Sequence, residues 1–396
     1  MPETQAVTAV PGVNHRGVAM MSAAHVVDDI YQGVVPAMLP FLVAERHYTY
    51  AAVSGLVLAA TVFSSVAQPL FGWWADRGSR RWLIAAGMLT AGAGIAVSGL
   101  SSSYELTWLA LAVSGIGVAA FHPEAARAAR KAAGSSTQAM SVFAVGGNVG
   151  YALGPLLATP VLLLAGLEGT ALLVLPAAVM ALVLVLRLGP VLDGTASRPR
   201  RSSMPTGDDD WAAFGWLTGI VVVRSILFFG MTTFLALYLL VELDATTGVA
   251  AAALTVFLGS GAVGTLLGGW VADRAGKIAS IRVGFALALP ALLGVVLAPN
   301  ATVAMACVVL TGLGVYMPFS VFVVLGQDYL PQRIGTASGV TVGLAVSAGG
   351  LASPLLGLVA DSTDLRTALM LLLALPVVGL MLTTRMREPG RPTPSG

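Results

Sequence analysis

Four polar side chains recur at helical spacing inside a long apolar stretch near the start of the chain. His25, Asp28, Asp29 and Gln32 follow the i, i+3, i+4, i+7 pattern, which places all four on one face of a helix. Two adjacent carboxylates in a poorly hydrated site cannot both ionise freely, because desolvation and mutual repulsion oppose the second charge. One of them can therefore hold a proton near neutral pH, and a neighbouring histidine can relay it.

The chemistry that this stripe predicts is proton exchange. We assign His25, Asp28 and Asp29 to proton coupling, with Asp28 as the exchanging acid and Asp29 as the alternative, because the sequence does not separate two neighbours. The competing interpretation is a structural tie, in which the carboxylates only pair with a nearby cation.

Further polar residues interrupt other apolar stretches, and we expect them to line a substrate cavity. They are His122, Asn148, Arg224 and Tyr316, together with Gln32 of the stripe. Arg224 can pair with Asp28 or Asp29, or it can offer a bidentate fork to an anionic cargo. A permanent structural ion pair is the alternative for this arginine.

The segment Phe121-His122-Pro123-Glu124 carries two more titratable groups. Pro123 should distort a helix at this point, and residues 122 and 124 point about 200° apart on it. We expect His122 to face the cavity and Glu124 to pair with Arg127 at i+3. A histidine satisfied by packing is the alternative for His122, and Asn148 either contacts cargo or bridges helices.

These residues need a membrane fold to position them. Of 396 residues, 57% are hydrophobic and only 10% are charged, whereas an average soluble domain has roughly 25% charged residues. A charged group at the bilayer centre costs at least ~2.5 kcal/mol, so it is expected to face an interior cavity. The single cysteine, Cys307, excludes disulfides and cysteine-based metal sites.

Apolar runs long enough to span a bilayer predict an all-α polytopic membrane protein with twelve transmembrane helices. They fall near 18–44, 50–75, 82–102, 105–130, 137–165, 169–189, 212–241, 248–272, 279–298, 302–327, 335–360 and 365–386. Eighteen of the 21 Lys and Arg residues lie on the side of the two termini, which predicts that both termini are cytoplasmic.

The chain repeats itself at an offset of 197 residues. Gly72-Trp73-x-Ala75-Asp76-Arg77 recurs as Gly269-Trp270-x-Ala272-Asp273-Arg274, so two copies of a six-helix unit are expected. The same offset carries Arg224 to position 27, beside Asp28, which puts opposite charges at near-equivalent places around a midplane site.

These features divide the chain into five predicted parts. They are a cytoplasmic tail (1–17), an N-terminal six-helix bundle (18–190), a polar, charged cytoplasmic linker (191–211), a C-terminal six-helix bundle (212–386) and a second cytoplasmic tail (387–396).

The stretch GWWADRGSRR (72–81) resembles the loop signature of the major facilitator superfamily, Gly-x-x-x-Asp-Arg-x-Gly-Arg-Arg, from which it departs at Gly78-Ser79. The resemblance implies the major facilitator fold, with two pseudo-symmetric six-helix bundles. It also implies a cytoplasmic gate that latches the two halves, assigned here to Gly72, Asp76, Arg77, Arg81, Asp273, Arg274 and Asp328. The alternative is that these arginines only set the topology.

A narrower resemblance is to the fosmidomycin-resistance branch of that superfamily. It rests on the His25 to Gly33 stripe, Gln68-Pro69-Leu70-Phe71-Gly72, Phe121-His122-Pro123-Glu124, Gly146-Gly147-Asn148 with Gly154-Pro155, and Gly326-Gln327-Asp328-Tyr329-Leu330-Pro331. It implies a proton-coupled drug antiporter that exports a fosmidomycin-like phosphonate or another drug by alternating access.

Two other functions stay open from the sequence: an uptake symporter or facilitator for a sugar or organic acid, and, more remotely, a polytopic membrane enzyme or receptor. No Walker-type loop and no His or Cys cluster with metal-ligand spacing occurs in the sequence. We therefore expect no enzyme activity, no cofactor and no metal, with the proton gradient as energy source. The expected protein is a monomer in the cell membrane that binds a small molecule and protons but no nucleic acid.

Overall fold

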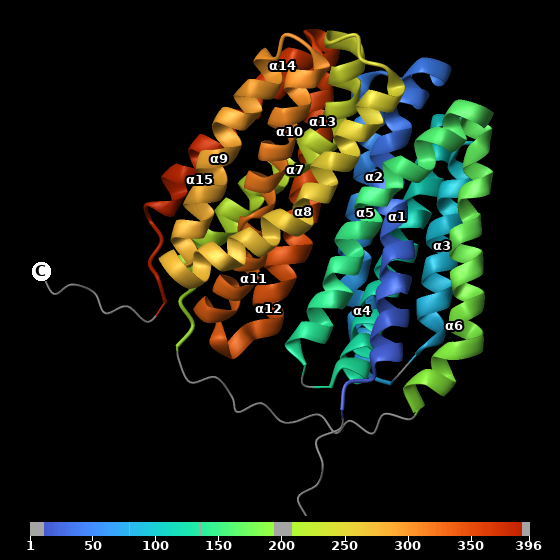
Figure 1. Ribbon diagram of the computed structural model, residues 1–396, viewed down its shortest axis with the longest axis vertical. Helices are drawn as coiled ribbons and strands as arrows, with labels where there is room; N and C mark the ends of the chain where they lie inside the picture. Colours follow the sequence, from blue (N-terminus) through green and yellow to red (C-terminus); the bar gives the residue numbers. More distant parts are fainter. Residues whose placement is uncertain (1–11, 79, 135, 194–207, 390–396) are drawn as a thin grey trace, which may run out of the picture.

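The computed structural model describes residues 12–78, 80–134, 136–193 and 208–389, and in these ranges the chain is helical (Figure 1). The first half comprises α1 (His15–Arg46), α2 (Tyr50–Asp76), α3 (Trp82–Ser98), α4 (Tyr104–Ala133), α5 (Thr137–Ala165), the 3₁₀ turn η1 (Leu167–Val174) and α6 (Leu175–Asp193). Residues 1–11 of the predicted tail, most of the predicted linker and residues 390–396 lie outside the described residues.

The second half runs from Trp211 to Thr383. It comprises α7 (Trp211–Glu242), α8 (Thr247–Ala275), α9 (Lys277–Leu297), α10 (Ala301–Tyr316), α11 (Pro318–Tyr329), η2 (Pro331–Arg333), α12 (Ile334–Ser338), the π-helix η3 (Gly339–Leu344), α13 (Ala345–Ser362), α14 (Leu365–Leu371) and α15 (Ala374–Thr383).

The twelve predicted spans are confirmed. In the described ranges, eleven helical segments are long and apolar enough to cross a membrane, and the twelfth, α3, is an apolar helix of 17 residues. Four spans are built from shorter helical segments, because α10 gives way to α11 at Met317 and Pro318, α12 and α13 flank η3, α14 meets α15 at Leu372 and Leu373, and η1 precedes α6. Pro318 contributes to the first break, since it has no backbone N–H to continue the ladder.

Helix ends follow ordinary capping chemistry. Thr49, Ser103, Ser136 and Thr246 each accept a hydrogen bond from the backbone N–H three residues later, which satisfies one of the free donors of the first turn. Gly276 ends α8 with φ of 101°, a left-handed conformation that glycine adopts without strain.

The two halves repeat each other in packing as well as in sequence. Gly87 of α3 crosses α4 at Gly117, and Gly284 of α9 crosses α10 at Gly314, again at an offset of 197 residues. At both crossings a Cβ on either glycine would come within 3 Å of the other helix, so the close approach requires glycine.

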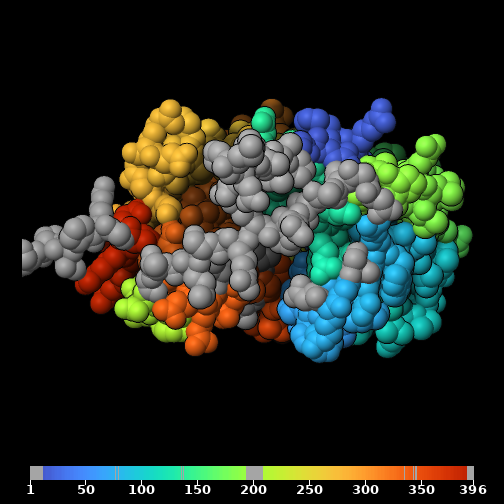
Figure 2. Space-filling model, turned by 90° about the horizontal axis from the view of Figure 1, so that it is seen from below, coloured from blue at the N-terminus to red at the C-terminus, as the bar shows by residue number. Residues whose placement is uncertain are grey.

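The halves lie apart at one end of the molecule and meet at the other (Figure 1). We name the end where α6 finishes and α7 begins the linker end, and the opposite end the distal end. At the distal end α13 packs on α2, and Gly357 of α13 faces the backbone of Ala51. Seen from the linker end, the α1 to α6 half and the α7 to α15 half stand side by side (Figure 2).

Candidate functional site

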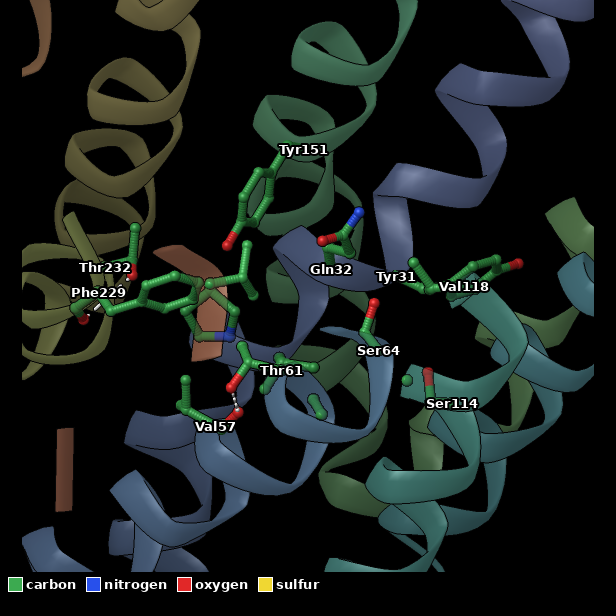
Figure 3. A pocket seen from close by; sticks show the side chains of 15 residues that line it. Tyr31, Gln32, Val57, Thr61, Ser64, Ser114, Val118, Tyr151, Phe229 and Thr232 are labelled. Carbon is green, nitrogen blue, oxygen red and sulfur yellow. Dashed lines mark hydrogen bonds between the residues drawn. The ribbon is translucent and has the colours of Figure 1, made fainter. Parts of the chain in front are cut away.

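A cavity lies between the two halves (Figure 3). Helices of the first half supply most of its wall, and α7 and α13 supply the rest. The lining residues are Tyr31, Gln32, Val35, Pro36, Val57, Ala60, Thr61, Ser64, Ser114, Gly115, Val118, Tyr151, Phe229, Thr232 and Val346. Eight of these fifteen residues are apolar and seven carry a polar side-chain group, and such a mixture of apolar and polar groups suits a small-molecule site.

Beside this cavity, α1 and α4 bring together two histidines and two aspartates. His25 Nε2 lies 3.3 Å from Asp29 Oδ2, and His122 Nε2 lies 3.3 Å from Asp29 Oδ1. His122 Nδ1 lies 3.7 Å from Asp28 Oδ2. We name His25, Asp28, Asp29 and His122 the acid–imidazole cluster.

Both imidazole rings are anchored through Nδ1. His25 Nδ1 lies 2.8 Å from the carbonyl oxygen of Phe143 on α5, and His122 Nδ1 lies 2.8 Å from that of Val118 on α4. Since a carbonyl oxygen only accepts, each Nδ1 carries a hydrogen and donates it. The other nitrogen of each ring, Nε2, therefore faces the Asp29 carboxylate.

Gln32 connects the acid–imidazole cluster to the cavity. Its side-chain amide donates to Asp29 Oδ1 at 2.5 Å, and the same residue lines the cavity wall. Val118 makes a second connection, because its backbone accepts from His122 and it also belongs to the wall. A molecule in the cavity can therefore act on the cluster through Gln32.

Asp28 is the most deeply buried of the four groups. It is fully buried, and neither carboxylate oxygen has a hydrogen-bond partner among the described residues. Its nearest basic atom is His122 Nδ1, which already donates to Val118. An ionised carboxylate in this setting is costly, whereas a protonated one is much less so.

Glycines of α5 allow α1 to approach closely enough to form this arrangement. A Cβ on Gly147 would lie 2.5 Å from Asp29 Oδ2 and 2.7 Å from His25 Nε2. A Cβ on Gly154 would collide with the backbone of Gly33 on α1. The run of glycines in α5 is therefore needed for the helix contact and, at Gly147, for the space beside the cluster.

Arg224 lies in the second half, on α7, and is buried. Its Nε donates to the carbonyl of Val315 at 2.9 Å, close to the break between α10 and α11, and its guanidinium lies over the rings of Phe228, Tyr316 and Phe319. Among the described residues it forms no ion pair, so the pairing with Asp28 or Asp29 that the sequence allowed is not made here.

The acid–imidazole cluster and Arg224 contact equivalent backbone positions in the two halves. Ser114-Gly115-x-Gly117-Val118 of α4 recurs as Thr311-Gly312-x-Gly314-Val315 of α10, at the offset of 197 residues. The carbonyl of Val118 accepts from an imidazole, and that of Val315 accepts from a guanidinium. The duplicated frame therefore holds titratable groups in one half and a permanent cation in the other.

The described cavity differs from the predicted one in its lining. Of the five residues expected there, Gln32 is in the wall, whereas His122 faces Asp29 and Tyr316 packs against Arg224. Asn148 is half-buried on α5 and is also outside this wall. The physical reason is the helix packing, which turns His122 toward α1 and fills the space around Arg224 with aromatic rings.

Tyr151 is one of the wall residues that the sequence analysis did not assign to the cavity. It points into the cavity from α5, opposite Phe229 of α7 (Figure 3). Its ring lies 6.0 Å from that of Phe228, and Phe228 in turn lies under Arg224, so aromatic contacts link the cavity wall to the buried cation. The presence of a tyrosine in the mostly apolar stretch 137–165 could have indicated this role.

The predicted gate residues make contacts within their own half in this conformation. Arg77 and Arg274 stack on Trp73 and Trp270 of their own helices, and Asp328 pairs with Lys277 at 2.5 Å. Gly72 has open space around it, Asp273 is exposed, Arg81 precedes α3, and the side chain of Asp76 is outside the described part of the chain.

Next to this loop, Glu124 has the role that the sequence predicted and an additional one. It lies 3.8 Å from Arg127, as expected from the i+3 spacing, and it also accepts a hydrogen bond from the backbone N–H of Arg80 at 2.9 Å. Arg127 donates to the carbonyl of Ala75 near the end of α2. These contacts tie α4 to the loop between α2 and α3.

Comparison with known proteins agrees with this architecture. The profile of the Major Facilitator Superfamily matches residues 21–354. A protein of Escherichia coli (strain K12) named Fosmidomycin resistance protein is 30% identical over 370 residues, covering 91% of this chain and 90% of that protein. The uncharacterized MFS-type transporter YfnC of Bacillus subtilis (strain 168) is 30% identical over 372 residues, with the same coverage.

Solved structures show the same fold at low identity. A bacterial homolog of the human lysosomal transporter Spinster, described as inward-facing and occupied, superposes with a TM-score of 0.79 at 17% identity over 96% of this chain and 98% of that one. The nucleoside transporter NupG superposes with a TM-score of 0.73 at 13% identity, over 94% and 100%.

Proposed function

Because the chain belongs to the Major Facilitator Superfamily, we propose that it is a proton-coupled antiporter that exports a small molecule by alternating access between its two halves. Its family and its structural neighbours are transporters, so the chain is a non-enzymatic transporter that spans a membrane many times. The name of the Escherichia coli relative suggests the cargo class, a fosmidomycin-like phosphonate or another drug.

The observation that carries this proposal is the hydrogen bond between Gln32 and Asp29. Gln32 belongs at once to the cavity wall and to the acid–imidazole cluster, so cargo that engages its amide withdraws a donor from the Asp29 carboxylate. Losing a hydrogen bond makes the ionised form of Asp29 less favourable. Cargo occupancy and protonation are then coupled through one side chain.

Asp28 supplies the second part of the coupling. In this conformation its carboxylate is fully buried and has no hydrogen-bond partner among the described residues, which favours the protonated form. Release of that proton requires a conformation in which water or a cation reaches the carboxylate. A change in the packing of α1 and α4 between the two states of the cycle provides that access.

Arg224 supports an anionic cargo. A buried guanidinium with no carboxylate partner in the described structure is costly unless a ligand provides the counter-charge during part of the cycle. Tyr151 and Phe228 connect it to the cavity, so a modest rearrangement of these rings brings an anion within its reach. A phosphonate meets this requirement.

We infer from the basic loops that the protein lies in the cell membrane with both termini in the cytoplasm. On that assignment the linker end is cytoplasmic, the distal end is closed, and the conformation described here is inward-facing. The separation of Arg77 and Asp328 from the opposite half agrees with a latch that is open in this state. We propose that the protein functions as a monomer.

Purified protein in liposomes tests the proposal. We expect fosmidomycin flux to follow an imposed pH gradient in the wild type and in Asp244→Asn, which changes an exposed loop carboxylate at a backbone conformation that asparagine also adopts. We expect Gln32→Leu to weaken the link between flux and pH. Flux without proton movement would instead indicate a facilitator, and proton-coupled uptake would indicate a symporter for a sugar or organic acid.

A further inference from the structure

We propose that His25, His122 and Asp29 form a binding site for a divalent transition-metal ion of the zinc class. One histidine nitrogen or carboxylate oxygen from each residue can be chosen so that the three atoms lie within 4.8 Å of one another. No spacing pattern in the sequence indicates this site, because its ligands come from two helices and His122 is 93 residues from Asp29.

The orientation of the two imidazoles is that of metal ligands. Each ring donates its Nδ1 hydrogen to a backbone carbonyl, of Phe143 in one case and Val118 in the other, and presents Nε2 to Asp29. Metal-binding histidines are held in this way, because a hydrogen bond at one nitrogen fixes the tautomer and leaves the other lone pair for the ion.

The contacts with Asp29 require a positive charge. A neutral ring with its hydrogen on Nδ1 has a lone pair on Nε2, and here both lone pairs would point at carboxylate oxygens 3.3 Å away. That arrangement is repulsive unless protons or a cation lie between the rings and Asp29. The geometry therefore suits either protonated rings or one cation shared by the three residues.

The separations suit a small tetrahedral ion. Two ligands bound at about 2.0–2.1 Å in tetrahedral geometry lie about 3.3 Å apart, which is the separation of His25 Nε2 and Asp29 Oδ2. Two imidazoles and one carboxylate, without a thiolate, select Zn²⁺, Co²⁺ or Ni²⁺ over Ca²⁺ and Mg²⁺, which prefer oxygen ligands alone. Three protein ligands leave a fourth position open.

Space and access are also present. Gly147 has no Cβ, and one added there would lie 2.5 Å from Asp29 Oδ2 and 2.7 Å from His25 Nε2. The His122 side chain is 22% exposed, against 10% for that of His25, so an ion reaches the site from the His122 side.

Binding exchanges one divalent ion for two protons. If both imidazoles are protonated before binding, M²⁺ displaces the two Nε2 hydrogens, two Nε2–metal bonds and one carboxylate–metal bond form, and the charge of the site is unchanged. Metal affinity is therefore linked to proton release. Metal binding does not depend on the proposed transport function. Only one consequence of binding, competition between the metal ion and the coupled protons, rests on that function.

The test is a titration of the purified full-length protein, carrying no polyhistidine tag, with Co²⁺ in detergent. We expect one Co²⁺ per chain, visible absorption bands of a low-symmetry site, and loss of these bands when Zn²⁺ is added. His25→Gln, His122→Gln and Asp29→Asn should each weaken binding by more than about 10-fold, the lower bound for losing even an outer-shell partner.

The matched control is the double variant His15→Gln/His47→Asn, which removes the other two of the four histidines. Asparagine suits position 47, where φ is 55°. Gly147→Ala keeps all three ligands but occupies their space, so it should also weaken binding even if a ligand variant fails to fold. The inference is wrong if the bands are missing in the wild type, persist in His122→Gln, or disappear in the control. No cargo or pH gradient is used, so these results are independent of transport.

Discussion

Asp361 connects the two halves of the molecule at the distal end. It lies near the end of α13, and its two carboxylate oxygens accept hydrogen bonds from the backbone N–H groups of Tyr50 and Ala51 at 2.8 and 2.9 Å. These are the first two residues of α2, and Thr49 satisfies the next free donor, that of Ala52. A side chain of one half thus caps a helix of the other, and we expect Asp361→Ala to open this end.

The magnitude follows from the capping geometry. Loss of a helix-capping carboxylate costs about 0.5–2 kcal/mol, and the favourable charge at the positive end of the helix adds about 0.3–1 kcal/mol at an exposed site. Asp361 is exposed, so the lower part of this range applies. We take about 1–2 kcal/mol, which shifts the equilibrium between the closed and open distal end roughly 5–30-fold.

Distances between spin labels at the distal end measure that shift. Ser102 in the first half and Gly248 in the second are both exposed, and a side chain at Gly248 meets no other atom within 4 Å. With Cys307, the only native cysteine, replaced by serine, labels at 102 and 248 report the separation of the halves. We expect Asp361→Ala to transfer population from the shorter distance to a longer one.

Asp364→Ala is the matched control. Asp364 caps α14 of its own half by accepting from the Thr367 N–H at 2.6 Å, and this hydrogen bond holds the pKa of its carboxyl below the usual value. The control therefore removes the same charge from the same loop without touching α2. If Asp361→Ala gives the wild-type distances, or if the control shifts them equally, the carboxylate of Asp361 does not hold the halves together.

Three further outcomes follow from the site. Asp28→Asn should fold at least as stably as the wild type in thermal scans, because a neutral amide replaces a buried carboxyl that has no hydrogen-bond partner among the described residues. It should also lose pH-driven flux, and unchanged flux would move the exchanging role to Asp29. Arg224→Ala should destabilise the protein by about 1–3 kcal/mol, because it removes the hydrogen bond to Val315 and the contacts with aromatic rings. It should also reduce transport of anionic cargo but not of neutral cargo. Gly154→Ala should destabilise the protein by about 1–3 kcal/mol in the same scans. Gly215→Ala, whose added methyl group meets open space, should not destabilise it. Equal melting temperatures of the two variants would show that the crossing of α1 and α5 can widen.

The number and limits of the spans could be predicted because they depend on local properties of the chain. Apolar runs and polar breaks set them, and the predicted stretch 137–165 coincides with α5. The repeat at residues 72–77 and 269–274 likewise indicated two similar halves, which the fold confirms. The breaks inside four spans were not predicted, since an apolar run has the same composition whether its helix is continuous or interrupted.

The composition of the site was only partly accessible from the sequence. The stripe of His25, Asp29 and Gln32 could be predicted because helical spacing alone brings these residues together. Contact with His122 could not, since it depends on how α4 turns against α1. The surroundings of Arg224 were also hidden, because equivalent positions in two halves do not fix the distance between them.

On the proposed mechanism, the asymmetry between the halves explains why duplication alone would not make a coupled transporter. The carbonyl of Val118 lies before Pro123 of the same helix, that of Val315 lies before Pro318 at the start of α11, and each accepts from a basic side chain. An imidazole such as that of His122 is a side chain that can gain or lose a charge, whereas the guanidinium of Arg224 stays charged. A second histidine in place of Arg224 would give two titrating halves with no fixed charge to attract an anion. A second arginine in place of His122 would hold Asp29 permanently ionised. Only the mixed arrangement lets one half change its charge while the other keeps an attraction for cargo.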